Sequence, residues 1–290
     1  MHISVSCLPP VVAGASGELK ARILPGVLAG EKISALAVTE PGAGSDVAQL
    51  ATTARRDGDH YVVNGSKMFI TSGMRADWYT VAVRTGGPGA AGVSLLAIER
   101  DPPGFTRTEL KKMGWWASDT AELHFDDCRV PASNLIGAEG QAFPLIMRNF
   151  NGERLTLAAS SCGAAQACLE DAVAWARERK TFGQPLIAHQ VIRHKLVDMA
   201  ERIEATRALI DDLASRLDAG EQPVAQTAMA KNYAARTMQF CADAAVQILG
   251  GSGYMRGVRV ERIYREVKVM MIGGGAEEIL KDLAARQLGF

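Results

Sequence analysis

One glycine-rich segment near the start of the chain carries residue types suited to ligand binding. Residues 37–46 read AVTEPGAGSD. Gly42 and Gly44 let a ligand approach the backbone closely, while Thr39 and Ser45 offer hydroxyl groups and amides to a polar ring or a phosphate. A Pro-Gly-Ala-Gly run taken alone is more often a plain loop, so the remaining residues must decide between the two interpretations.

Two charged residues in the second half of the chain could take part in chemistry. Arg179 lies in RERKTFG, and its guanidinium fork matches phosphate oxygens bidentately. The alternative is a basic helix end that interacts with its own dipole. Glu153 lies in NGERL, where it is either a general base or a solvated helix residue paired with Arg154.

Composition and charge argue against several classes of protein. The 290-residue chain carries 32 acidic and 32 basic residues, so no overall field points to nucleic acid or to an anionic membrane. The first residues lack a basic n-region and a long apolar core, and no later apolar run is long enough to span a bilayer. The sequence predicts a cytoplasmic protein of about two domains.

Neither a disulfide framework nor a metal site is expected. The five cysteines show no CxxC spacing, and three lie in helical patterns where a buried thiol acts as a small apolar residue. His189 and His194 are five residues apart, which is off the i, i+4 face that helical zinc pairs use.

Periodicity divides the chain into a β part and a helical part. Short strands are expected at 35–39, 52–56, 60–64, 67–73, 78–84, 92–98 and 122–125, and helices at 140–180, 190–217, 223–249 and 276–288. Strands without intervening helices favour an antiparallel sheet. The predicted fold class is α+β, an antiparallel β-sandwich or barrel followed by a C-terminal four-helix-type bundle.

Several segments together resemble the acyl-CoA dehydrogenase family and follow its order along the chain. They are the flavin-binding signature at 37–46, the strand at 67–73, the segments at 177–190 and 247–254, and the loop at 272–279, which reads IGGGAEEI. The resemblance implies FAD as cofactor and an acyl-CoA as substrate. It also implies domains at 35–138 (β, binding flavin and acyl-CoA) and 139–290 (helical bundle), with 1–34 as the remnant of a preceding helical domain.

The resemblance assigns FAD contacts to both halves of the chain. In the β half they are Leu36, Thr39, Gly44, Ser45, Phe69 and Thr71, with Phe69 standing where tryptophan is usual. In the helical half the residues expected to reach the FAD of a neighbouring subunit are Arg179, Phe182, Gln190, Gln247, Gly250 and Gly251. Ala276, in place of the usual threonine, and Glu278 complete the set. We therefore expect a homodimer or homotetramer.

The catalytic glutamate of many family members has no counterpart in the late loop, where the corresponding residue is Gly274. NGERL matches the isovaleryl and long-chain branches, which place the base on a helix, so Glu153 is the expected base. In the family, the backbone N–H of this loop residue polarises the thioester carbonyl, and Gly274 retains that N–H. Ser45, Asn151 and Arg154 are further candidates for substrate contacts.

The implied reaction is α,β-dehydrogenation of an acyl-CoA thioester. A carboxylate removes the α-proton while hydride passes from Cβ to flavin N5, and an electron-transfer flavoprotein is the expected acceptor. Two alternatives remain open. One is a related acyl-CoA oxidase, which the oxygen reactivity of the reduced flavin would separate. The other is a non-catalytic subunit that completes the FAD site of a partner.

The short N-terminal segment is a departure from the family pattern. The family's first helical domain covers one wall of the acyl pocket, and only residues 1–34 stand in its place here. Without that wall, apolar surface would be exposed beyond the few hundred Å² that soluble monomers tolerate. We expect either a shortened gene product or a wall supplied by a partner.

Overall fold

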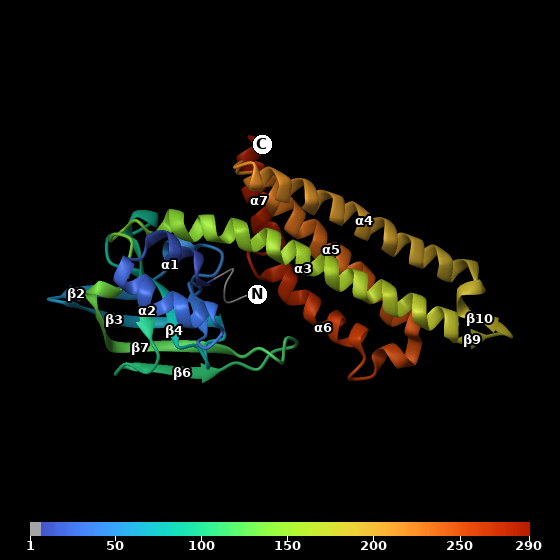
Figure 1. Ribbon diagram of the computed structural model, residues 1–290, viewed down its shortest axis with the longest axis horizontal. Helices are drawn as coiled ribbons and strands as arrows, with labels where there is room; N and C mark the ends of the chain where they lie inside the picture. Colours follow the sequence, from blue (N-terminus) through green and yellow to red (C-terminus); the bar gives the residue numbers. More distant parts are fainter. Residues whose placement is uncertain (1–6) are drawn as a thin grey trace. The chain divides into compact units, whose positions relative to one another are not determined.

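The computed structural model describes residues 7–290 (Figure 1). Residues 1–6, which begin the predicted 1–34 segment, lie outside the described part. The chain divides into two compact units, Met1–Gly152 and Glu153–Phe290, which we call the β unit and the helical unit.

An eight-stranded sheet forms the centre of the β unit. The strand order is β6-β7-β3-β2-β4-β5-β8, and β1 pairs with β4. Neighbours are antiparallel except that β4 is parallel to β1 and, at one residue pair, to β2. The strands are β1 Ser34–Ala37, β2 Thr53–Asp57, β3 His60–Thr71, β4 Trp78–Arg84, β5 Val93–Glu99, β6 Phe105–Glu109, β7 Thr120–Pro131 and β8 Leu135–Ile136.

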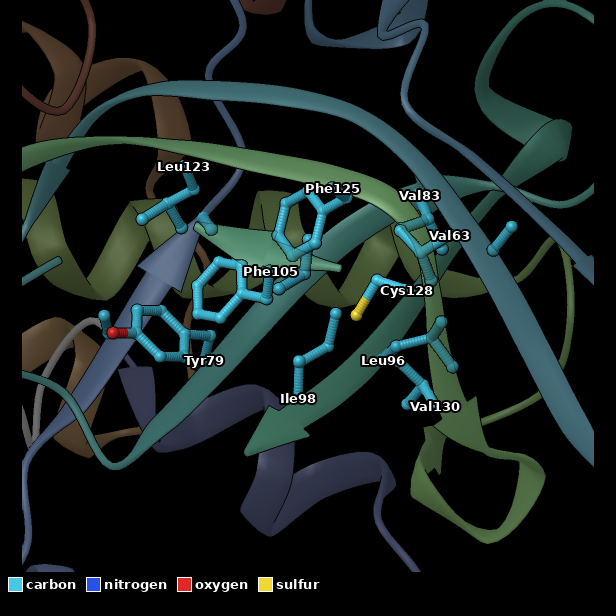
Figure 2. Packing of buried hydrophobic residues seen from close by; sticks show 14 of the residues in the cluster. Val63, Tyr79, Val83, Leu96, Ile98, Phe105, Leu123, Phe125, Cys128 and Val130 are labelled. Carbon is cyan, nitrogen blue, oxygen red and sulfur yellow. The ribbon is translucent and has the colours of Figure 1, made fainter. Parts of the chain in front are cut away.

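The strands β4 and β5 are buried on both faces, which explains their continuous apolar sequences. On one face Tyr79 packs edge-on against Phe105, which stacks on Phe125, with both pairs of ring centroids 5.0 Å apart (Figure 2). The other face contributes Trp78, Ala82 and Leu95 to a second core that includes residues of two short helices, α1 Pro9–Gly14 and α2 Gly17–Leu28.

Helices make up almost all of the helical unit. They are α3 Ala142–Glu178, which begins in the β unit, α4 Gln190–Asp218, α5 Val224–Leu249, α6 Arg259–Ile272 and α7 Glu277–Leu288. The alanine-rich α5 contacts α4, α6 and α7 and is buried along most of its length. A small hairpin of β9 Lys180–Thr181 and β10 Gln184–Pro185 lies between α3 and α4. The predicted α+β class is confirmed.

Besides the β9–β10 hairpin, the strands β6 and β8 and the helix α6 were absent from the sequence prediction. β6 and β8 are short, and β8 has only two residues. The helix α6 reads RVERIYREVKVMMI, and its many charges obscured the buried stripe of Val260, Ile263, Val267 and Met270. That stripe has the i, i+3, i+7 spacing of an amphipathic helix, so it was available in the sequence.

A buried ion pair anchors the segment after β1 to the sheet. Lys67 Nζ on β3 donates to Glu40 Oε1 at 2.7 Å, and the two side chains are 0% and 6% exposed. The Glu40 carboxylate also accepts from the backbone N–H groups of Ala51 and Thr52, at 2.6 and 2.9 Å. Burial alone would raise the pKa of Glu40, but Lys67 and these donors keep it below its ordinary value. Burial lowers the pKa of Lys67 to about 8 against the opposing effect of Glu40, so both groups are charged at neutral pH.

Breaking this pair should be costly. We expect Lys67→Met to lower the free energy of unfolding by about 3–5 kcal/mol, because it leaves a buried carboxylate without its cation. The double variant Lys67→Met/Glu40→Gln should recover about half of that loss, since no buried charge remains. Urea unfolding of the three proteins measures both values.

The exposed pair formed by Arg129 Nη1 and Asp57 Oδ2, 2.9 Å apart, provides the control. Arg129→Met should cost less than about 1 kcal/mol. Equal losses in the Lys67 single variant and in the double variant would contradict the role assigned to the buried pair.

Candidate active site

The glycine-rich 37–46 segment forms a tight loop held against β3. Glu40 and Ala43 exchange backbone hydrogen bonds of 3.1 and 3.2 Å, and Met68 N donates to Thr39 O at 2.8 Å. Thr39 is half-buried, whereas Gly44 and Ser45 are exposed. The structure thus places the 37–46 motif beside β3, the strand that carries most of the predicted 67–73 segment.

Phe69 is turned outward by an irregularity in β3. The pairing of β3 with β7 shifts register between Lys67 and Ile70, and Phe69 has φ +61°. A positive φ is costly for an aromatic residue, and bulges commonly re-aim a side chain next to a functional site. The ring is 66% exposed although its neighbours Lys67 and Ile70 are buried. The candidates Leu36 and Thr71, on β1 and β3, are half-buried.

The loop between α6 and α7 lies against α3 in the helical unit. Arg154 Nε donates to Gly274 O at 3.0 Å, which joins two sequence-predicted candidates 120 residues apart. Burial lowers the pKa of the Arg154 guanidinium, and the neighbouring Glu153 charge acts in the opposite direction. The Gly274 N–H meets no acceptor within the described residues.

Glycine at position 274 is explained by the backbone. Its φ is +68°, and a Cβ built there would lie 2.7 Å from Leu157 Cδ1 and 3.8 Å from Arg154 Cγ. A side chain at 274 would therefore point at α3. Leu157 is four residues after Glu153, so the two share a helix face one turn apart.

A second group of candidates surrounds a hollow of about 470 Å³ in the helical unit. It is lined by Arg179 and Thr181 from the end of α3 and β9, and by Gly250, Gly251 and Ser252 after α5. This combination of a guanidinium, hydroxyl groups and unencumbered glycines is what a diphosphate requires.

The hairpin beside this hollow carries one strained and exposed aromatic side chain. Phe182 has φ +50° and is 97% exposed. Thr181 Oγ1 lies 3.0 Å from His189 Nε2, so the histidine ties the hairpin to the start of α4. Gln190 and Gln247 are also exposed, at the first turn of α4 and the last turn of α5.

The remaining candidates lie on α3 and at the start of α7. Asn151 and Glu153 are half-buried on α3, while Ala276 and Glu278 flank the first residue of α7. Leu36, Thr39, Gly44, Ser45, Phe69, Thr71 and Asn151 belong to the β unit, and the other candidates belong to the helical unit.

Sequence reasoning overlooked two buried lysines, Lys67 and Lys231, and the carboxylate Glu40. Lys231 Nζ donates to Gly275 O at 2.8 Å, and burial lowers its pKa to about 8. The available signal was a lysine at a core-facing position of an alanine-rich helix, where an apolar residue is usual.

Residues 7–290 contain neither a cluster of metal ligands nor a helix that could span a membrane. No group of three His, Cys, Asp or Glu side chains is placed to hold a metal ion. No helix has the length and apolar character needed to cross a membrane. The five cysteines are buried and unbridged.

Comparison with known proteins gives a consistent result. Residues 35–128 match the acyl-CoA dehydrogenase middle domain, and residues 140–289 match the acyl-CoA dehydrogenase C-terminal domain. Cyclohexane-1-carbonyl-CoA dehydrogenase of Geobacter metallireducens is 41% identical over 96% of this chain and 74% of its own length. Mitochondrial isobutyryl-CoA dehydrogenase of Dictyostelium discoideum is 42% identical over 93% of this chain and 66% of its own.

A solved structure extends the agreement to three dimensions. The crystal structure of a probable acyl-CoA dehydrogenase from Mycobacterium abscessus has a TM-score of 0.97 and 50% identity, covering 99% of this chain and 77% of that one. Both halves of the sequence, the fold and the relatives therefore agree, and the chain belongs to the acyl-CoA dehydrogenases, a family of oxidoreductases.

Proposed function

We propose that this protein carries out FAD-dependent α,β-dehydrogenation of an acyl-CoA, with Glu153 as the base that removes the α-proton. The observation that carries the proposal is the direction in which a side chain at position 274 would point. The Cβ direction of Gly274 points at Leu157, one helical turn from Glu153. A carboxylate carried by α3 can therefore reach the region that a loop side chain would have occupied.

The local electrostatics suit a carboxylate base. Arg154 is 7% exposed and adjoins Glu153, whose charge acts against the effect of burial on the pKa of the guanidinium. A buried guanidinium that is bound to a loop carbonyl is fixed in place, so its field on Glu153 is fixed as well. An ionised glutamate is the form that a general base requires.

The thioester carbonyl needs a hydrogen-bond donor as negative charge develops on its oxygen. The Gly274 N–H supplies one, because it has no acceptor within the described part of the chain. The loss of a side chain at this position removes a loop carboxylate but leaves the backbone donor. Base and carbonyl donor thus come from two elements in contact, α3 and the α6–α7 loop.

The residues present fit a flavin dinucleotide. Arg179, Thr181 and Ser252 line a hollow with two glycines that impose no steric limit, which suits the diphosphate. In the β unit the exposed Phe69 ring beside the Thr39 loop offers an apolar face to an aromatic ring. FAD, when bound, supplies the acceptor for the hydride that leaves Cβ. The strained, solvent-exposed Phe182 supports contact with a second copy of the chain, so we include a homodimer or homotetramer in the proposal.

The relatives favour a branched acyl group. Two of them are named for isobutyryl-CoA and cyclohexane-1-carbonyl-CoA, both of which carry two carbon substituents on Cα. We extend this class of substrate to the present chain, with an electron-transfer flavoprotein as acceptor and the cytoplasm as location.

Removing the carboxylate of Glu153 tests the assignment. Glu153→Gln should leave FAD bound but slow anaerobic bleaching of the flavin by a branched acyl-CoA by about 10²–10⁴-fold, the loss expected for a general base. The amide is nearly isosteric, so folding should be unaffected. Stopped-flow absorbance of the flavin measures the rate.

Glu170→Gln is the matched control, because it makes the same change at an exposed position of the same helix. Its rate should equal that of the wild type. Unchanged bleaching in Glu153→Gln would exclude Glu153 as the base.

The intersubunit role of Arg179 generates a separate prediction. Arg179→Ala should weaken FAD binding by about tenfold or more, the effect of losing a charge-assisted hydrogen bond to a phosphate, and should weaken the oligomer with it. Equilibrium dialysis gives the flavin content, and sedimentation velocity gives the oligomeric state. Arg177→Ala, an exposed arginine two residues earlier, should change neither. Full FAD content in a demonstrably monomeric sample would refute the prediction.

A further inference from the structure

We propose that Lys231 is a positioning residue that fixes the 273–276 loop, so that the Gly274 N–H meets the thioester oxygen. The inference rests on the proposed function for the identity of that oxygen. The anchoring itself rests only on contacts within the helical unit.

Lys231 is an unusual residue for its place in the fold. It lies on α5 among alanines and is 1% exposed. Its ammonium donates to Gly275 O at 2.8 Å, and within residues 7–290 no carboxylate lies within ion-pair distance of it. A buried charge without a direct counter-ion costs folding free energy, and a methionine of similar length would fill the space without that cost.

The contacts around Lys231 explain what the charge does. Side chains of two helices bind three carbonyl oxygens in and just after the loop. Arg154 Nε reaches Gly274 O at 3.0 Å, Lys231 Nζ reaches Gly275 O at 2.8 Å, and Asn232 Nδ2 reaches Glu277 O at 3.1 Å. Arg154 and Asn232 are themselves buried, at 7% and 4% exposure.

The loop requires such external anchors because of its own sequence. Gly273, Gly274 and Gly275 are consecutive, and the last two have φ +68° and +113°. Glycine has the largest conformational freedom of any residue, so three in a row do not define one conformation. Two cations and an amide that bind the carbonyls of residues 274, 275 and 277 restrict the peptide planes and, with them, the direction of the Gly274 N–H.

Lys231 is the anchor that can be removed most cleanly. Arg154 adjoins the proposed base, so its replacement would disturb two functions at once. Lys231→Met keeps the length of the side chain and removes only the ammonium. Lys268→Met is the matched control, because Lys268 is an exposed lysine on α6 one turn before the loop.

Amide hydrogen exchange measured by mass spectrometry reports on the anchor directly. In the FAD-bound protein, Lys231→Met should raise exchange in the peptide that covers residues 272–278 by about tenfold, the effect of losing one charge-assisted hydrogen bond. Peptides of the β unit should not change, and Lys268→Met should match the wild type. Unchanged exchange at 272–278 in Lys231→Met would overturn the proposal.

Flavin reduction separates positioning from simple stabilisation. In Lys231→Met the rate at saturating acyl-CoA should fall about tenfold with little change in the half-saturating concentration, since the oxyanion donor acts mainly in the transition state. In the wild type this rate should also fall as pH rises through about 8, where Lys231 loses its proton. Arg154 and Glu277 are the charged groups whose fields act on that proton, and Lys231→Met should lack this limb of the pH profile.

The two measurements distinguish the possible failures. If the wild type is not bleached by any acyl-CoA, the proposed function fails, and the exchange result alone decides the anchor. If the wild type is bleached but Lys231→Met retains its rate and pH profile, the positioning role is wrong while the function stands. If Lys231→Met does not fold, the wild type alone provides the test. Its exchange at 272–278, corrected for the intrinsic effect of pH, must then rise above pH 8. Failure to rise would overturn the proposal.

Discussion

The hydrogen bond from Arg154 to the carbonyl of Gly274 is the interaction on which the account of the active site depends. It joins the helix that carries Glu153 to the loop that lacks a carboxylate, and it does so in the part of the chain that folds as one compact unit. Because α3 and the loop are in contact, we propose that a base on either element would serve the same substrate carbon. In that proposal, the glycine at 274 and the glutamate at 153 are complementary features of one site.

In the β unit, a different buried cation fixes a glycine-rich loop. Lys67 and Glu40 lie beneath a loop whose exposed residues are small and polar, and the pair fixes that loop to β3 just before the bulge that exposes Phe69. In both units, a buried lysine binds next to a glycine-rich backbone segment. The conformational freedom of these glycine-rich loops is thus restricted by ionic and hydrogen-bonded contacts that local sequence patterns do not show.

The sequence predicted the helices and strands far better than it predicted these side-chain contacts. A short apolar run located β4, and helical periodicity located α4 and α5, closely, because both signals depend on burial. The outward turn of Phe69 depends on a register shift between β3 and β7, and the position of Lys231 depends on how α5 meets a loop 44 residues later. Such tertiary effects leave no periodic trace. Family resemblance supplied Glu153 and Gly274, but only the structure shows that the Cβ direction of Gly274 meets α3 one turn from Glu153.

The central claim is that Glu153 takes the α-proton at a site where Gly274 cannot. Its most direct test is the washout of deuterium from Cα of an acyl-CoA analogue that binds but cannot transfer hydride, followed by mass spectrometry in ordinary water. If Glu153 is the base, the FAD-bound wild type should show rapid washout and Glu153→Gln none above the uncatalysed rate, although both bind the analogue equally. Washout at the wild-type rate in Glu153→Gln would contradict the claim.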